Sequence, residues 1–238
     1  MISIEYNNLG EVKSTEMFKV KYDYLLKKIN DALSTIITEK DSPENIIYKA
    51  MNYSLMAGGK RLRPVLLLAV SEMLDIDLEE VMPYACALEM IHTYSLIHDD
   101  LPAMDNDDYR RGVLTNHKVF GEATAILAGD ALLNYAFEHM LDCLMDKSRN
   151  KSYSLEDGVK AVSYIAKAAG VNGMIGGQVV DIESEGKEIT LEQLEYIHKH
   201  KTGALIKASV MVPAILFSLD EDKKNALERY SSSIGLAF

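Results

Sequence analysis

The sequence predicts an all-α protein, and three observations lead to that fold class. Glycine and proline are scarce, with 14 and 5 residues among 238, which disfavours a turn-rich all-β fold. Residues typical of helix starts and stops separate long apolar segments. No window shows the sustained alternation that marks a half-buried strand, so we expect no sheet.

The first expected helices lie between residues 1 and 97. Residues 1–40 are expected to be helical, with no further role assigned. Ser42-Pro43 is typical of a helix start and Gly58-Gly59 of a helix end, which predicts a helix between them. A sequence similar to a capping box, D-L-E-E, begins at Asp77. Residues 81–97 follow it and are apolar nearly all round, so that helix must be buried.

The later helices follow from composition and capping. Residues 122–145 and 159–182 are long, apolar and rich in alanine and leucine. Thr190 and Gln193 have capping-box spacing, so another helix is expected to begin there. The chain has no Gly/Ser-rich linker and no internal repeat, and we expect residues 1–238 to form one domain.

Charge and cysteine usage exclude several classes of protein. The net charge of −11 and the pI of about 5.0 disfavour general binding to nucleic acids or anionic membranes. The longest apolar runs, 64–70 and 210–217, are too short to span a bilayer, and the N-terminus lacks the pattern of a signal peptide. Cys86 and Cys143 have no metal-like spacing. We therefore expect reduced, structural thiols and a cytoplasmic protein.

A polar stripe runs down the apolar helix at 81–97. At about 100° per residue, His92, Ser95 and Asp99 fall within about 60° of one another. One interpretation is a satisfied buried hydrogen-bond network. Because the stripe ends in the paired carboxylates Asp99-Asp100, a functional site is the alternative hypothesis.

Five aspartates occur among the ten residues 99–108. Magnesium binds through carboxylate oxygens and commonly shares its coordination with substrate phosphates. The run lacks the Gly and Glu of an EF-hand calcium loop, and a solvated acidic turn is the other interpretation. Arg110-Arg111-Gly112 follows directly, and arginine pairs are common phosphate ligands, although here they could simply neutralise the aspartates.

Two further motifs are rich in glycine. The sequence G-G-K-R-L-R-P at 58–64 is a basic cluster without Walker-loop spacing, and it suits either a second anion site or a solvated face. Residues 173–181 carry three glycines followed by Gln178 and Asp181, and Lys201-Thr202-Gly203 indicates a local kink. Each of these features could serve packing or function. We expect surface or structural roles for the remaining histidines: His98, His117, His139, His198 and His200.

Taken together and in this order, the motifs resemble the trans-isoprenyl diphosphate synthase (polyprenyl synthetase) family, most of all its bacterial farnesyl diphosphate synthase (geranyltranstransferase) branch. The match covers roughly residues 40–238. The resemblance implies an isoprenoid-synthase-type helical bundle around a central cavity. It also implies a prenyltransferase that uses magnesium.

The resemblance assigns a role to each motif. Three aspartates would hold magnesium on the allylic diphosphate: Asp99, Asp100 and Asp105. Arg110 would grip that diphosphate. Four residues would hold the diphosphate of isopentenyl diphosphate: Lys60, Arg63, His92 and Arg111. Three would lie over the reacting allylic carbon: Lys201, Thr202 and Gln178.

Product length depends on the residues that precede the aspartates. A prenyl tail growing away from Asp99 would pass Ser95 and Tyr94, about 6–7.5 Å along the helix axis. In the family, an aromatic at the fifth position before the motif, together with the insertion Pro102-Ala103, accompanies a fifteen-carbon product. We therefore expect farnesyl diphosphate, made from dimethylallyl or geranyl diphosphate and isopentenyl diphosphate.

Three alternatives remain open at this point. They are a geranylgeranyl or longer-chain synthase, a catalytically silent diphosphate-binding subunit, and a terpene cyclase, which takes no second diphosphate. In the family, a stretch like Ser233–Phe238 leads into a second aspartate-rich motif and further helices. We therefore expect the 238-residue form to be either a fragment of a longer chain or a truncated protein, with poor activity in the absence of the remainder. The apolar helices at 81–97 and 122–145 and the resemblance predict a homodimer.

Overall fold

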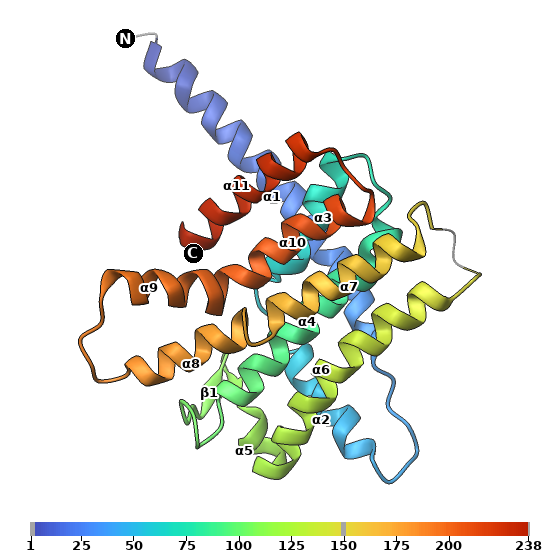
Figure 1. The fold of residues 1–238 in the computed structure, drawn as a ribbon, viewed down its shortest axis with the longest axis vertical. Helices are drawn as coiled ribbons and strands as arrows, with labels where there is room; N and C mark the ends of the chain where they lie inside the picture. Colours follow the sequence, from blue (N-terminus) through green and yellow to red (C-terminus); the bar gives the residue numbers. More distant parts are fainter. Residues whose placement is uncertain (1–2, 149–150, 238) are drawn as a thin grey trace.

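The computed structural model describes residues 3–148 and 151–237, and helices form almost all of its regular structure, which confirms the all-α class (Figure 1). The elements in chain order are α1 (Ser3–Ile36), α2 (Asn45–Leu55), α3 (Leu62–Met73), α4 (Leu78–Asp99), β1 (Tyr109–Arg110), β2 (Val113–Leu114), α5 (Asn116–Phe120), α6 (Glu122–Met145), α7 (Leu155–Ala169), α8 (Met174–Ser184), α9 (Leu191–Ile197), the π-helical turn η1 (His198–Thr202), α10 (Gly203–Leu216) and α11 (Glu221–Ala237).

Helix α4 lies at the centre of the bundle and contacts α1, α2, α3, α6, α7 and α10 (Figure 1). Its apolar side chains are buried, as expected of a helix that is apolar nearly all round. Leu88 and Ile91 are fully buried, and each such side chain contributes about 1.5–3 kcal/mol of transfer free energy. Because α4 is held on all sides, its C-terminal end at Asp99 has a fixed position in the molecule.

Helix α1 packs one face on α3 and α4, while its N-terminal end projects beyond the bundle (Figure 1). Leu25, Ile29 and Leu33 recur every four residues and are buried, whereas Met17 and Phe18 are exposed. The sequence predicts a helix here without assigning it a role. Its packing places α1 beside the loop that precedes α3.

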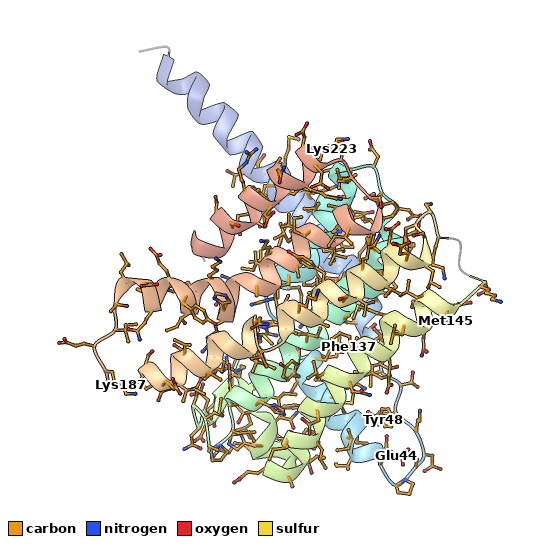
Figure 2. The ribbon with its side chains drawn as sticks, in the orientation of Figure 1. Glu44, Tyr48, Phe137, Met145, Lys187 and Lys223 are labelled. Atoms are coloured by element: carbon orange, nitrogen blue, oxygen red, sulfur yellow. The ribbon has the colours of Figure 1, made fainter. Side chains whose placement is uncertain are left out.

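Two of the helix starts predicted from capping residues are confirmed, and a third is displaced. Thr190 and Gln193 form the predicted capping box, and Asp77 caps α4 by accepting from the Glu79 amide at 3.0 Å. The predicted start at Ser42-Pro43 was wrong by two residues, because residues 42–44 form a turn and α2 begins at Asn45. Figure 2 shows Glu44 and Tyr48 at this end of α2.

Helix α2 also ends earlier than predicted. It stops at Leu55 rather than at Gly58-Gly59, and the two glycines lie in the following loop at positive φ angles of 85° and 114°. Those angles are in the region that glycine adopts without steric cost, so the pair shapes the loop rather than the helix end.

Two features of the middle of the chain differ from the predictions. The apolar segment 159–182 is two helices, because α7 ends before Gly170 and α8 begins after Gly173. A short hairpin is also present, where β1 and β2 pair antiparallel around Arg111-Gly112. Both turn residues have positive φ, 55° and 82°, as a two-residue hairpin turn requires. Within residues 3–148 and 151–237, no helix is both long and apolar enough to cross a bilayer.

Candidate active site

A cavity of about 410 Å³ lies between the C-terminal half of α4, the helix α8 and the turn η1. Its polar lining comes from distant parts of the sequence: Arg63, His92, Ser95, Asp99, Gln178, Lys201 and Thr202. Its apolar lining includes Tyr94, Met104, Met174, Ile175, Val179 and Ile182. Larger grooves of about 810 and 490 Å³ lie beside α7 and α11, but none of the predicted site residues lines them. The cavity combines an apolar wall with a few polar groups, which is typical of a small-molecule site.

The glycines of α8 bring that helix directly onto η1. A Cβ atom at Gly177 would lie 2.1 Å from the backbone nitrogen of Lys201, so any larger residue would separate the two segments. Gln178 then donates to Asp99 Oδ1 at 2.8 Å, and Lys201 Nζ lies 2.5 Å from Asp181. The kink predicted near residues 201–203 is the π-helical turn itself. The glycine motif thus joins α8, η1 and the end of α4.

The aspartates differ in their surroundings. Asp99 faces the cavity, Asp100 is buried and Asp105 is exposed. Burial raises the pKa of Asp99 to about 6; the Asp105 and Asp100 charges add to the rise, and Lys201 and Arg110 oppose it. Burial also raises the pKa of Asp100, against a hydrogen bond from Arg110. A cation near Asp99 would relieve the cost of its ionisation.

The carboxylates suit a magnesium ion whose coordination shell is completed by other oxygen ligands. Asp99 and Asp105 repel one another, and the Asp105 amide donates to the Asp99 carbonyl at 2.9 Å. Asp100 is paired with Arg110 instead. In the part of the chain that the structure describes, no three His, Cys, Asp or Glu side chains form a metal-binding group. Magnesium needs only one or two carboxylates when water or phosphate oxygens supply the rest, so Asp99 and Asp105 fit it.

The neighbouring residues Arg110 and Arg111 form hydrogen bonds with different partners. Arg110 pairs with the buried Asp100, with nitrogen–oxygen distances of 2.6 and 2.5 Å, and with Asp107 at 3.3 Å. Arg111 donates to the Gly58 carbonyl across the chain. Both arginines line a small cleft of about 30 Å³ rather than the larger cavity.

Cationic groups outnumber carboxylates beside His92. Arg61 and Glu89 form a buried ion pair at 2.7 Å, and Arg63 and Arg111 lie in the field of the same carboxylate. Burial lowers the pKa of Arg63, and burial with Arg63 and the other arginines holds the pKa of His92 well below 6.5. Arg63 Nε and His92 Nδ1 are buried and have no hydrogen-bond partner among the described residues. Because Glu89 is paired with Arg61, the charges of Arg63 and Arg111 are not fully compensated, and this region favours an anion.

The structure brings some predicted residues together and leaves others apart. Arg63, His92, Tyr94, Ser95, Asp99, Gln178, Lys201 and Thr202 share the cavity. Lys60 is exposed and does not line it, and Arg110, Arg111 and Asp100 border the adjacent small cleft. Tyr94 is buried with its ring edge-to-face against His98 at 5.7 Å, and Ser95 donates to the His92 carbonyl at 2.9 Å.

Sequence reasoning missed two residues of this region. His98 lines the cavity, which the sequence did not indicate; its Nε2 lies 3.0 Å from the Ile126 carbonyl oxygen, a contact of the structural kind that we expected. Its place next to Asp99 is the signal that could have indicated the cavity. Glu89 was overlooked as the counterion of Arg61. The signal in that case was a lone acidic residue inside an apolar run.

Comparisons with known proteins show which proteins this chain resembles. The family model described as polyprenyl synthetase matches residues 44–238. A dimethylallyltranstransferase of Fischerella ambigua is 51% identical over 220 residues, which are 91% of this chain and 61% of that protein. A farnesyl diphosphate synthase of Geobacillus stearothermophilus is 50% identical over 88% of this chain and 69% of its own length. A geranylgeranyl diphosphate synthase of Cyanophora paradoxa is 52% identical over 81% of this chain and 62% of its own length.

A solved structure shares the fold. The geranyltransferase of Legionella pneumophila superposes with a TM-score of 0.87 at 39% identity, covering 94% of this chain and 77% of that one. A helical bundle with this cavity and these motifs defines an isoprenyl diphosphate synthase fold. The chain belongs to the polyprenyl synthetase family, as its motifs indicated. It spans 61% of the length of the Fischerella relative.

Proposed function

We propose that this protein is a prenyltransferase that adds isopentenyl diphosphate to an allylic diphosphate, once to geranyl or twice in succession to dimethylallyl, and releases farnesyl diphosphate. One observation carries the proposal. The lining of an apolar cavity contains a carboxylate, Asp99, and two buried nitrogens, Arg63 Nε and His92 Nδ1, that have no hydrogen-bond partner among the described residues. That arrangement suits two diphosphates, one held through a metal and one held by side chains alone.

Each predicted residue has a part in this proposal. Asp99, Asp100 and Asp105 serve the magnesium end, with Asp100 orienting Arg110 toward the allylic diphosphate. Lys60, Arg63, His92 and Arg111 serve isopentenyl diphosphate. Lys201, Thr202 and Gln178 face the allylic carbon. Magnesium, when bound, would offset the negative charge that develops on the departing diphosphate.

The chemistry needs little from the protein beyond charge and shielding. The bond between the allylic carbon and the diphosphate oxygen breaks, and Lys201 helps to stabilise the departing anion. The apolar wall excludes water from the allylic cation. The isopentenyl double bond attacks this cation to form the new carbon–carbon bond. A proton is then lost from the adjacent carbon to the released diphosphate, so no protein base is required.

Product length is the finer part of the proposal, since the relatives carry both farnesyl and geranylgeranyl names. Tyr94 supports the fifteen-carbon product. Its ring lines the cavity on the same helix as Asp99, is 6% exposed, and packs against His98. A ring held in this position would block the growth of a longer tail. The geranylgeranyl product is the second candidate.

We also propose that the protein works as a homodimer in the cytoplasm. The apolar surface of α4 is covered within the chain, but α6 exposes Ile126, Leu127, Leu141 and Met145. Figure 2 shows Met145 at the outer end of α6. Apolar side chains grouped on one exposed helix are typical of a subunit interface. Light scattering at micromolar concentration should give the mass of a dimer, and the mass of a monomer would contradict this assignment.

A labelled-product assay tests the proposal. The 238-residue chain is incubated with geranyl diphosphate, labelled isopentenyl diphosphate and magnesium, and the products are resolved by chain length. A fifteen-carbon product supports the full proposal, and a twenty-carbon product supports the second candidate. If there is no product but geranyl diphosphate still binds in a magnesium-dependent manner, the chain is a diphosphate-binding subunit or an incomplete catalyst. Consumption of geranyl diphosphate alone would indicate a cyclase.

A further inference from the structure

The loop at residues 58–61 has a backbone conformation that depends on its surroundings. Gly58, Gly59 and Arg61 all have positive φ angles, of 85°, 114° and 47°. Glycine adopts this region without steric cost, but a non-glycine residue remains there only when neighbouring contacts hold it. The loop carries Lys60 and leads directly to Arg63. The contacts that hold this loop therefore also help to set the positions of Lys60 and Arg63.

The Arg61 side chain forms its hydrogen bonds within the protein interior. Its guanidinium donates to Glu89 at 2.7 Å, to the Leu55 carbonyl at 2.5 Å and to the Asn30 side-chain oxygen at 3.2 Å. The residue is 3% exposed. A guanidinium with partners on three sides and no open face cannot bind an anion from the cavity. Arg61 differs in this respect from Arg63, whose Nε has no partner among the described residues.

Helix α1 supplies part of what holds the loop. The Tyr22 hydroxyl donates to the Lys60 carbonyl at 2.5 Å, and Asn30, two turns further along α1, accepts from Arg61. From the other side, Arg111 donates to the Gly58 carbonyl and its guanidinium covers Gly59. The loop is thus held between α1 and the hairpin, with polar contacts on three of its four residues.

We propose that Tyr22 and Asn30 of α1 are positioning residues for the second diphosphate site, acting through the Lys60 backbone and the Arg61 side chain. This inference rests on the proposed function and adds to it residues that touch no substrate. It gives the N-terminal helix a role in binding isopentenyl diphosphate. The allylic site at Asp99 receives no contact from either side chain and should not depend on them.

Binding measurements on the full 238-residue chain test this inference. Tyr22→Phe removes one hydroxyl, and Asn30→Ala removes one acceptor. Tyr24→Phe on the same helix is the control for the first change. Asn52→Ala is the control for the second, because the Asn52 amide donates to the Ile37 carbonyl at 3.1 Å, away from the loop. Calorimetry gives the Kd for isopentenyl diphosphate and for geranyl diphosphate, and thermal unfolding gives the Tm.

The expected result is selective. Tyr22→Phe and Asn30→Ala should each weaken isopentenyl diphosphate binding by about three- to tenfold, the effect of one lost hydrogen bond, and change geranyl diphosphate binding less than about twofold. The controls should change neither Kd by more than about twofold. An unchanged Kd for isopentenyl diphosphate, or equal losses for both ligands, would overturn the role of α1. If the unaltered chain binds no isopentenyl diphosphate, the proposed function fails, and this inference fails with it.

Discussion

Replacing Gly177 by alanine should separate the two segments that form one wall of the cavity. The added Cβ would lie 2.1 Å from Lys201 N, 2.6 Å from Lys201 Cα and 2.7 Å from His200 C. Ordinary contact begins at 3.4 Å, so α8 and η1 would have to move apart by roughly 1.3 Å, the difference between 3.4 and 2.1 Å. These atoms are backbone and cannot rotate away.

The magnitude follows from two opposing effects. Overpacking of this kind costs about 1–3 kcal/mol, and alanine in place of a helical glycine returns about 0.5–1 kcal/mol. The net loss is therefore roughly 0–2.5 kcal/mol, which corresponds to a fall in Tm of up to about 10 °C for a chain of this size. The effect on turnover should be larger, because a displacement of about 1 Å in a catalytic group can cost about 100-fold in rate.

The assay compares Gly177→Ala with Gly158→Ala. At Gly158 in α7 the new Cβ meets Leu144 Cδ2 at 2.2 Å, a flexible methyl group that can turn aside. Tm and the rate of labelled-product formation are measured for both variants, with geranyl diphosphate affinity as a second readout. The control should retain the rate of the unaltered chain. A Gly177→Ala protein with unchanged Tm and rate would refute the close packing of α8 on η1.

The cavity and the buried charges give four further expectations. Tyr94→Ala should yield products longer than fifteen carbons on chromatography, and an unchanged product would show that the ring does not limit growth. Glu89→Leu leaves Arg61 buried without its carboxylate and should cost about 3–5 kcal/mol in urea unfolding; a loss below about 1 kcal/mol would contradict the buried pair. Because burial and Arg63 hold the pKa of His92 well below 6.5, the folded ring binds a proton less readily than the unfolded one. Stability should therefore fall as pH drops below 6.5, and His92→Asn should reduce that slope; equal slopes would contradict the shift. EDTA should abolish product formation but leave isopentenyl diphosphate binding intact, because side chains alone hold that diphosphate. A weaker Kd for isopentenyl diphosphate in calorimetry with EDTA would contradict this expectation.

Much of the fold could be predicted because its signals are local. The apolar run at 81–97 predicted a buried helix, and Thr190 with Gln193 predicted a capping box. Both depend on residues within one or two helical turns, where the backbone fixes the spacing. The break of 159–182 into α7 and α8 was missed although its cause is also local. A Cβ at Gly173 would lie 2.1 Å from the Ala168 carbonyl oxygen, but the sequence pattern alone does not distinguish a glycine that breaks a helix from one that packs against a neighbour.

By itself the sequence determined the all-α class, the family, and the residue types that the proposed chemistry requires. The stripe of His92, Ser95 and Asp99 followed from helical period alone, and these three residues share the cavity. Such conclusions are possible because a helix sets the relative direction of side chains that are near in sequence.

Only the tertiary structure decided which charged groups are paired inside the protein. It separated Arg61, which is held by Glu89 and Asn30, from Arg63, whose Nε is left without a partner among the described residues. It also joined Gln178 to Asp99 across 79 positions of the chain. Adjacent cations look alike in a sequence, and their roles differ because burial and distant partners set the cost of leaving each charge unpaired.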